Sequence, residues 1–146
     1  MPKPVLTALG FDFGMKHIGL AVGQTLTCSA NPLDILDVHD GIPHWEKIEA
    51  LIRIWDARAL VVGIPYNMDG SEQSFTFAAR KFARKLRSHF QLPVYTVDER
   101  LTTLEAKRQW RERKEKKNVK LPEHVDSYAA KLILEQWLKE NDNEND

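Results

Sequence analysis

Four acidic side chains stand in places that suggest chemistry. Asp12 ends the run ALGFD and is followed closely by a glycine, so it comes late in a stretch typical of a strand buried on both faces. Asp98 and Glu99 directly follow another short apolar run, and Asp126 shares one stripe of the last helix with Ala130. A carboxylate that loses its hydration costs several kcal/mol unless a donor or a cation replaces the water.

Carboxylates gathered at one edge of a sheet repel one another and are partly protonated when no cation is bound. A hard divalent cation resolves the repulsion, because Mg²⁺ or Mn²⁺ prefers oxygen ligands and keeps waters for substrate phosphates. Two such ions about 4 Å apart can activate water and stabilise the leaving oxygen in phosphodiester hydrolysis. No Cys/His metal pattern competes, since the five histidines are scattered and Cys28 has no evident histidine partner.

Each acid also has an ordinary structural explanation. Asp12 can be a turn-forming residue ahead of a glycine. Asp98 and Glu99 can lead into a helix, and Asp126 can favour the dipole of a first helical turn. Taken singly, each explanation is about as good as a functional one. All of them would have to hold at once, which favours the functional interpretation.

The elements that must position these acids follow from hydrophobic periodicity. We expect strands at 5–13, 18–22, 33–38, 59–64 and 93–97, and helices at 44–55, 72–90 and 123–139. Ser71 can cap the second helix, and Thr102 with Glu105 has capping-box spacing for a further one. Strands in a meander followed by strand–helix alternation predict an α/β domain with a mixed sheet of about five strands. Ligands in such sheets bind beyond the carboxyl ends of the strands, where the acids lie.

Length and composition set bounds on the class of protein. At 146 residues the chain is long enough for one domain, which we expect at 1–140, with a disordered acidic tail at 141–146. A single cysteine fits a reducing compartment, and neither a signal peptide nor a long apolar run is evident. We therefore expect a soluble, cytoplasmic protein without a membrane partner.

The zero formal net charge conceals a segregated distribution. Residues 80–120 hold 14 of the 21 basic and 5 of the 21 acidic side chains. A basic block of this kind favours binding to nucleic acid, since a polyanion would be attracted to it. A solvated helix face screened by acidic neighbours explains the same pattern equally well on charge alone. Within the block, 111–120 has no apolar residue before Val119 and reads as a helix end or a mobile loop.

Four stretches carry a resemblance to a known family. They are GFDFGMKHIGLAVG, VGIPYNMDGSEQ, VDERLTTLEA and EHVDSYAAKLIL, and they resemble, in this order, the signature stretches of the YqgF (RuvX) family. The resemblance covers nearly the whole chain. It implies a ribonuclease-H-like fold related to the RuvC resolvases. It also implies a nuclease role in processing the 5′ end of precursor 16S ribosomal RNA, with Holliday-junction resolution as the older proposal.

The resemblance also implies roles for individual residues. Asp12, Glu99 and Asp126 match the catalytic acids of the family, and Asp98 is a further candidate metal ligand, with Asp69 a weaker one. The expected cofactor is Mg²⁺ or Mn²⁺, as two ions. The candidate substrate-binding residues are Lys16, Asn67, Arg100, Lys114, Lys116 and Lys117. The segment 111–120 departs from the family, where a flexible, glycine-containing loop is more common.

The expected nuclease would act on precursor rRNA or branched DNA, with a ribosomal assembly as a candidate partner. Two other classes of protein are alternatives to this nuclease. A sugar-kinase- or actin-like ATPase also uses a DFG-type turn to cradle phosphate, but such proteins need two domains to enclose a nucleotide. A nucleic-acid-binding module without catalysis would keep the basic block and need no carboxylate site. The combination of acids and basic block favours the metal-dependent nuclease.

Overall fold

The computed structural model describes residues 5–67, 69–99 and 125–143. Within these residues the chain forms one six-stranded sheet in the order β4-β3-β2-β1-β5-β6. The strands are β1 (Thr7–Asp12), β2 (His17–Gln24), β3 (Ser29–His39), β4 (Ile42–Pro43), β5 (Ala57–Ile64) and β6 (Val94–Asp98). The described helices are α1 (Trp45–Trp55), α2 (Ser74–Phe90) and α4 (Val125–Asn143).

The sheet is mixed, as the sequence predicts. The first four strands form an antiparallel meander, whereas β1, β5 and β6 run parallel to one another. The parallel strands are joined through helices, which is the connection that parallel pairing requires. The carboxyl ends of β1, β5 and β6 therefore meet at one edge of the sheet.

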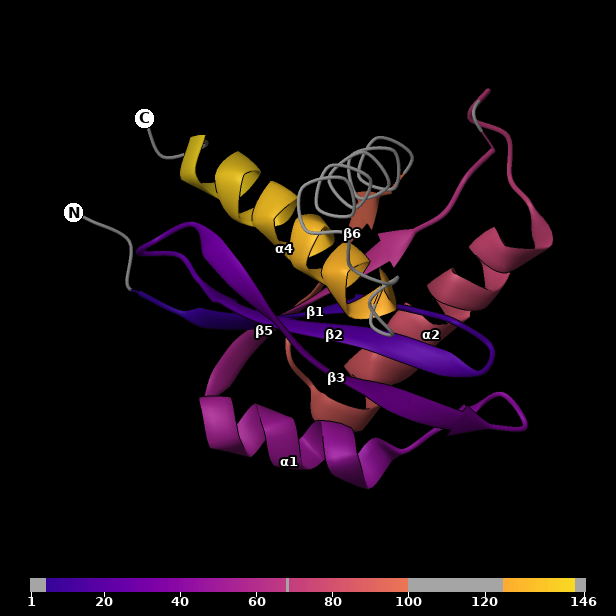
Figure 1. Cartoon of the computed structure of the whole chain (residues 1–146), viewed down its shortest axis with the longest axis horizontal. Coiled ribbons are helices and arrows are strands. Elements are labelled where there is room, and N and C mark those ends of the chain that lie inside the picture. Colours follow the sequence, from indigo (N-terminus) through magenta and orange to yellow (C-terminus); the bar gives the residue numbers. More distant parts are fainter. Residues whose placement is uncertain (1–4, 68, 100–124, 144–146) are drawn as a thin grey trace, which may run out of the picture.

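Helices cover both faces of the sheet (Figure 1). On one face, Leu9 and Phe11 of β1 belong to the core cluster that includes Ile48 of α1 and Phe82 of α2. On the other face, Ala8 packs in a second cluster beneath α4. This alternation along β1 follows from the period of two in a strand, and it assigns Gly10 and Asp12 to the face that α4 covers.

The amphipathic stripe predicted for the last helix is confirmed where side chains are described. Ala130 and Ile133 are fully buried and Trp137 is 8% exposed. None of the described helices is long and apolar enough to cross a membrane. The stripe predicted for α1 is right at Ile48, which is fully buried, but wrong at Trp55, the last residue of the helix, which is 41% exposed.

Three local predictions need correction. The connection expected at 25–32 ends at Cys28, whose φ of 53° closes the turn, and β3 begins at the next residue. The two-residue strand β4 was not expected, since Asp40 and Gly41 indicated only a loop. The cap of α2 is Gln73 rather than Ser71, because Gln73 and Thr76 form the capping box while Ser71 bonds within the preceding loop.

Candidate active site

Two of the predicted acids meet at the carboxyl edge of the parallel strands. Asp12 is the last residue of β1, and Glu99 directly follows β6. The Glu99 backbone N–H donates to the carbonyl oxygen of Ile64 at 3.1 Å, which fixes Glu99 at the end of β5. A hydrogen bond joins the side chains of Asp12 and Glu99. The sequence prediction that these two stretches converge is thus correct for the described residues.

Gly63 makes this meeting possible. The register pairs Phe11 with Val62, so Gly63 of β5 stands beside Asp12, between the strands that carry the two carboxyl groups. Neighbouring strands are about 4.8 Å apart, so the two side chains must reach toward each other over β5. A Cβ at Gly63 would lie 2.7 Å from Glu99 Oε2 and would overlap Ile133 Cδ1. The missing side chain leaves the space in which the carboxyl groups meet.

The electrostatics of the pair fit a cation. Burial is the main cause that raises the pKa of the Glu99 carboxyl above its ordinary value. The hydrogen bond with Asp12 lowers this pKa, and the negative charge of Asp98 raises it. Burial and the charge of Asp98 thus disfavour the ionised form of Glu99, and a cation bound at this place would offset both effects.

The first turn of α4 lies at the same edge. Leu138 Cδ1 is 3.0 Å from the Cβ position of Gly23, which pairs with the start of β1, and the Ala130 oxygen is 3.1 Å from the Cβ position of Gly10. The helix therefore runs antiparallel to β1, and its second residue, Asp126, begins α4 at the carboxyl end of that strand. The backbone of the third predicted acid is thus near the pair, while its side chain lies outside the described residues.

Ser127 holds this helical turn in place, and the sequence reasoning missed it. Its side chain is fully buried, and its hydroxyl donates to the carbonyl oxygen of Leu33 on β3 at 2.7 Å. The bond ties α4 to the sheet one residue after Asp126. The signal in the sequence was a serine between Asp126 and the apolar stripe of the helix. A serine buried at such a position needs a hydrogen-bond partner for its hydroxyl.

The loop after β5 is closed by its own polar groups. Asn67 donates its side-chain amide to Ser71 Oγ at 2.9 Å, and its backbone N–H donates to the Ser71 carbonyl at 2.9 Å. The Ser71 N–H and hydroxyl donate to Asp69 Oδ1 at 2.9 and 2.6 Å. Gly70 takes a φ of 90°, which a residue with a side chain rarely adopts. Asn67 is exposed in this loop, so its amide shapes the turn and remains accessible.

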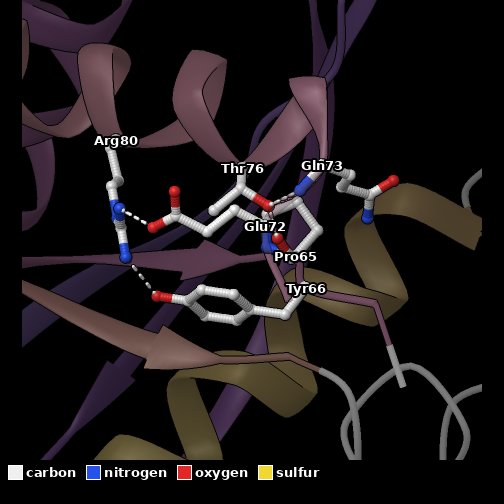
Figure 2. Close-up of polar contacts among 6 residues, drawn as sticks. All are labelled: Pro65, Tyr66, Glu72, Gln73, Thr76 and Arg80. Carbon is white, nitrogen blue, oxygen red and sulfur yellow. Dashed lines mark hydrogen bonds and ion pairs between the residues drawn. The ribbon is translucent and has the colours of Figure 1, made fainter. Parts of the chain in front are cut away.

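Contacts with α2 hold the start of the same loop (Figure 2). Arg80 donates to the Tyr66 hydroxyl at 2.8 Å and forms an ion pair with Glu72. Thr76 donates to the carbonyl oxygen of Pro65. The hydrogen bonds of Arg80 with Tyr66, the largest cause, and with Glu72 raise the pKa of Arg80. The helix α2 therefore fixes the segment that leaves the carboxyl end of β5.

The remaining residues of the predicted site are Lys16, Asp98, Arg100 and three lysines. Lys16 is exposed in the turn between β1 and β2. Asp98 ends β6 on the face of Thr96, since alternation sends Val97 to the face under α4. Arg100 and the lysines at 114, 116 and 117 lie outside the described residues, as do the helix expected from Thr102 and the segment 111–120.

The chemistry of the residues at this edge fits a metal ion. Among the side chains that the structure describes, no three His, Cys, Asp or Glu groups are close enough to hold an ion. Asp12 and Glu99 form a half-buried oxygen pair, and such pairs suit hard cations. A third ligand would have to come from Asp126, a water or the substrate.

Solved structures define the class of fold. T. thermophilus RuvC in complex with a Holliday junction substrate matches with a TM-score of 0.58 at 15% identity, over 93% of this chain and 95% of RuvC. The Fowlpox virus resolvase in complex with Holliday junction DNA matches with a TM-score of 0.51 at 12% identity, over 93% of this chain and 99% of the resolvase. The fold is thus the ribonuclease-H-like fold of the RuvC resolvases, as expected, with six strands rather than about five.

Sequence comparison gives the family. The RuvX family model, described as Holliday junction resolvase, matches residues 6–140. A Coxiella burnetii (strain Dugway 5J108-111) protein named "Putative pre-16S rRNA nuclease" is 67% identical over 144 residues, 99% of this chain and 100% of that protein. A Legionella pneumophila (strain Lens) protein of the same name is 49% identical over 142 residues, 97% of this chain and 100% of that protein. The chain belongs to the RuvX family, and the resemblance is confirmed.

Proposed function

We propose that this protein is a nuclease that hydrolyses phosphodiester bonds in precursor 16S ribosomal RNA. The observation that carries the proposal is the carboxyl pair of Asp12 and Glu99, which meet over Gly63 at the strand edge where ligands bind in α/β sheets. Two carboxyl groups gathered at this edge suit metal-assisted hydrolysis better than structural support. The names of the Coxiella and Legionella relatives support the choice of RNA.

The proposed cofactor is Mg²⁺ or Mn²⁺, as two ions. Asp12 and Glu99 would hold the metal, with Asp126 as the further candidate ligand. Asp98, the other acid predicted as a ligand, lies on the face of Thr96 and would act on the ions through its negative charge. When bound, the ions supply an activated water and stabilise the leaving oxygen. Metal binding needs ionised carboxyl groups and burial raises the pKa of Glu99, so the affinity for metal should rise with pH through the range in which Glu99 ionises.

The proposed substrate contacts surround the carboxyl edge. Lys16 and Arg100 would contact phosphate, and Asn67 would present its amide from the loop after β5. The lysines at 114, 116 and 117 would hold the strand farther from the cut. We place this activity in the cytoplasm, on free precursor RNA or on a ribosomal assembly intermediate.

A four-way DNA junction is the second candidate substrate. The description of the RuvX family as Holliday junction resolvase favours it. Both candidates are polyanions that would use the same carboxyl pair, so the choice depends on a direct comparison rather than on the site.

The test is cleavage of a fragment that spans the 5′ end of precursor 16S RNA and of a four-way DNA junction, each with Mn²⁺ or with EDTA. Faster metal-dependent cleavage of the RNA, at one position, is the expected result. Preferential cutting of the junction would replace the first candidate with the second. Binding of both without cleavage would contradict the nuclease and favour a non-catalytic binding module.

A further inference from the structure

The helix α2 carries a basic face that the carboxyl site does not use. Its 17 residues include five Lys or Arg and no Asp or Glu. Ala79 and Leu86 are buried toward the sheet. Arg80, Arg84 and Arg87 stand at offsets 0, 4 and 7, so they share one flank of the helix.

This flank borders a hollow between α2 and the edge strand β6. The hollow has a volume of about 290 Å³ and is lined by Arg80, Ala83, Arg84, Arg87, Val94 and Thr96. Among the residues that the structure describes, the lining contains three cations and no acid. A hollow of about 310 Å³ on the opposite flank of α2 is lined in part by Lys81, Lys85 and Asp40, so its charge is mixed. Only the first of these two hollows presents a single sign of charge.

Two of the three arginines are available to bind an anion. Arg80 is occupied by Glu72 and the Tyr66 hydroxyl, as Figure 2 shows. Arg84 and Arg87 are exposed, and within the described part of the chain neither guanidinium has an ion pair or a hydrogen bond. They are about 4.5 Å apart along the helix axis, so both can reach one phosphate or two consecutive ones.

The strand β6 adds neutral donors. Among the described strands it pairs only with β5, so its other side is an edge. Leu60 donates to the Pro93 carbonyl and Glu99 to the Ile64 carbonyl, which directs the odd-numbered residues of β6 toward β5. The N–H of Thr96 therefore lies on the edge side, and Thr96 is exposed and lines the hollow. Arginine, threonine hydroxyl and backbone N–H groups are the usual donors to nucleic-acid phosphates.

We propose that Arg84, Arg87 and Thr96 form a phosphate-binding subsite for the nucleic-acid backbone of the substrate, on the sheet face opposite the carboxyl pair. The inference rests on the proposed function for the identity of its ligand. Thr96 precedes Glu99 by three residues, about 10 Å along the strand, so one nucleic-acid chain that passes the β6 edge can contact both places. The hollow is small and its described lining includes three guanidinium groups, which suits a length of charged backbone rather than an enclosed small molecule.

The experiment measures binding separately from cleavage. In an Asp12→Asn background, the dissociation constants of a 20-nucleotide single-stranded RNA and of a four-way DNA junction are determined from 50 to 300 mM salt. The double variant with Arg84→Gln and Arg87→Gln is compared with a control double variant on α1. The control carries Lys47→Gln and Arg53→Gln and removes the same number of positive charges elsewhere. Arg84→Lys with Arg87→Lys keeps the charge. Thermal unfolding confirms that each variant is folded.

The glutamine pair on α2 should weaken binding at low salt and reduce the slope of log affinity against log salt by about 1, since each lost phosphate contact contributes about 0.7 on single strands. The α1 pair should leave the slope unchanged, and the lysine pair should restore most of it. Equal slopes for the two glutamine pairs on both substrates would overturn the inference. A reduced slope in a protein whose wild type cleaves neither substrate would sustain the subsite and reject the nuclease.

Discussion

Gly63 is the residue on which the geometry of the carboxyl pair depends most. Gly63→Ala would place a Cβ 2.7 Å from Glu99 Oε2 and into Ile133. Because β5 is paired with β1 on one side and β6 on the other, the side chains and α4 must move instead, at a cost of about 1–3 kcal/mol. We expect a lower melting temperature together with a loss of cleavage that persists well below that temperature. Wild-type cleavage by a stable Gly63→Ala protein would show that the two carboxyl groups need not meet over this residue.

The pH dependence of stability should report on Glu99. Burial raises its pKa in the folded protein, so this carboxyl stabilises the fold below its unfolded pKa, and that stabilisation is lost as pH rises through the folded pKa. Glu99→Gln cannot ionise. In EDTA we therefore expect the variant to melt about 2–4 °C above wild type at pH 7, with the difference shrinking toward pH 4. Differential scanning calorimetry across this range checks the sign, and a variant less stable than wild type at pH 7 would refute it.

At the scale of single residues, the sequence predicted that Asp12 and Glu99 converge. It did not predict that Gly63 leaves the space in which their side chains meet. Asp12 and Glu99 were identifiable because each follows an apolar strand. Gly63 was not, since a glycine within a short apolar run has no signature of its own. Its role depends on the strand order, which places β5 between β1 and β6.

At the scale of elements, α4 is positioned by one buried hydrogen bond next to its candidate ligand. Ser127→Ala would leave the Leu33 carbonyl oxygen without its donor and should cost about 1 kcal/mol. We also expect the rate of cleavage to fall by more than this loss of stability accounts for, because the first turn of α4 carries Asp126. Ser88→Ala, at an exposed position on α2, is the matched control. Equal cleavage by the two variants would mean that this bond does not position the site.

Element prediction succeeded where burial dominates. The stripe of α4 was found because its apolar residues have the helical period, and β5 was found because it is a short, continuous apolar run. It failed at the start of β3, at β4 and at the cap of α2. There, polar residues such as Ser29 and Gln73 are held by pairing or capping partners that are not evident from composition.

At the scale of the molecule, the segregated charge predicts where a polyanion binds. Lys114→Gln, Lys116→Gln and Lys117→Gln together should weaken RNA binding and reduce the salt slope by up to about 2, if each lysine contacts one phosphate. The comparison variant replaces Lys47, Arg53 and Arg58 with glutamine, which removes three charges on and beside α1. Fluorescence anisotropy in salt titrations measures both. A slope equal to that of wild type would remove 111–120 from the binding surface.

The overall architecture was predictable from strand and helix alternation, and the family from four short stretches. The choice between RNA and branched DNA was not, because both offer phosphates to the same carboxyl pair and the described residues include no base-reading motif that we recognise. That choice depends on shape across the whole surface rather than on any one residue.

The most direct test of the central claim is metal-dependent cleavage of the precursor 16S RNA fragment by wild type, Asp12→Asn and Asp34→Asn. Asp34 is exposed on β3 and serves as the matched control for a lost carboxylate. We expect Mn²⁺-dependent cutting by wild type and Asp34→Asn, and a reduction of at least 100-fold for Asp12→Asn at an unchanged or higher melting temperature, because a ligand of the proposed ions is lost while the fold keeps its shape. Equal cleavage by Asp12→Asn, or cleavage by wild type in EDTA, would contradict the account.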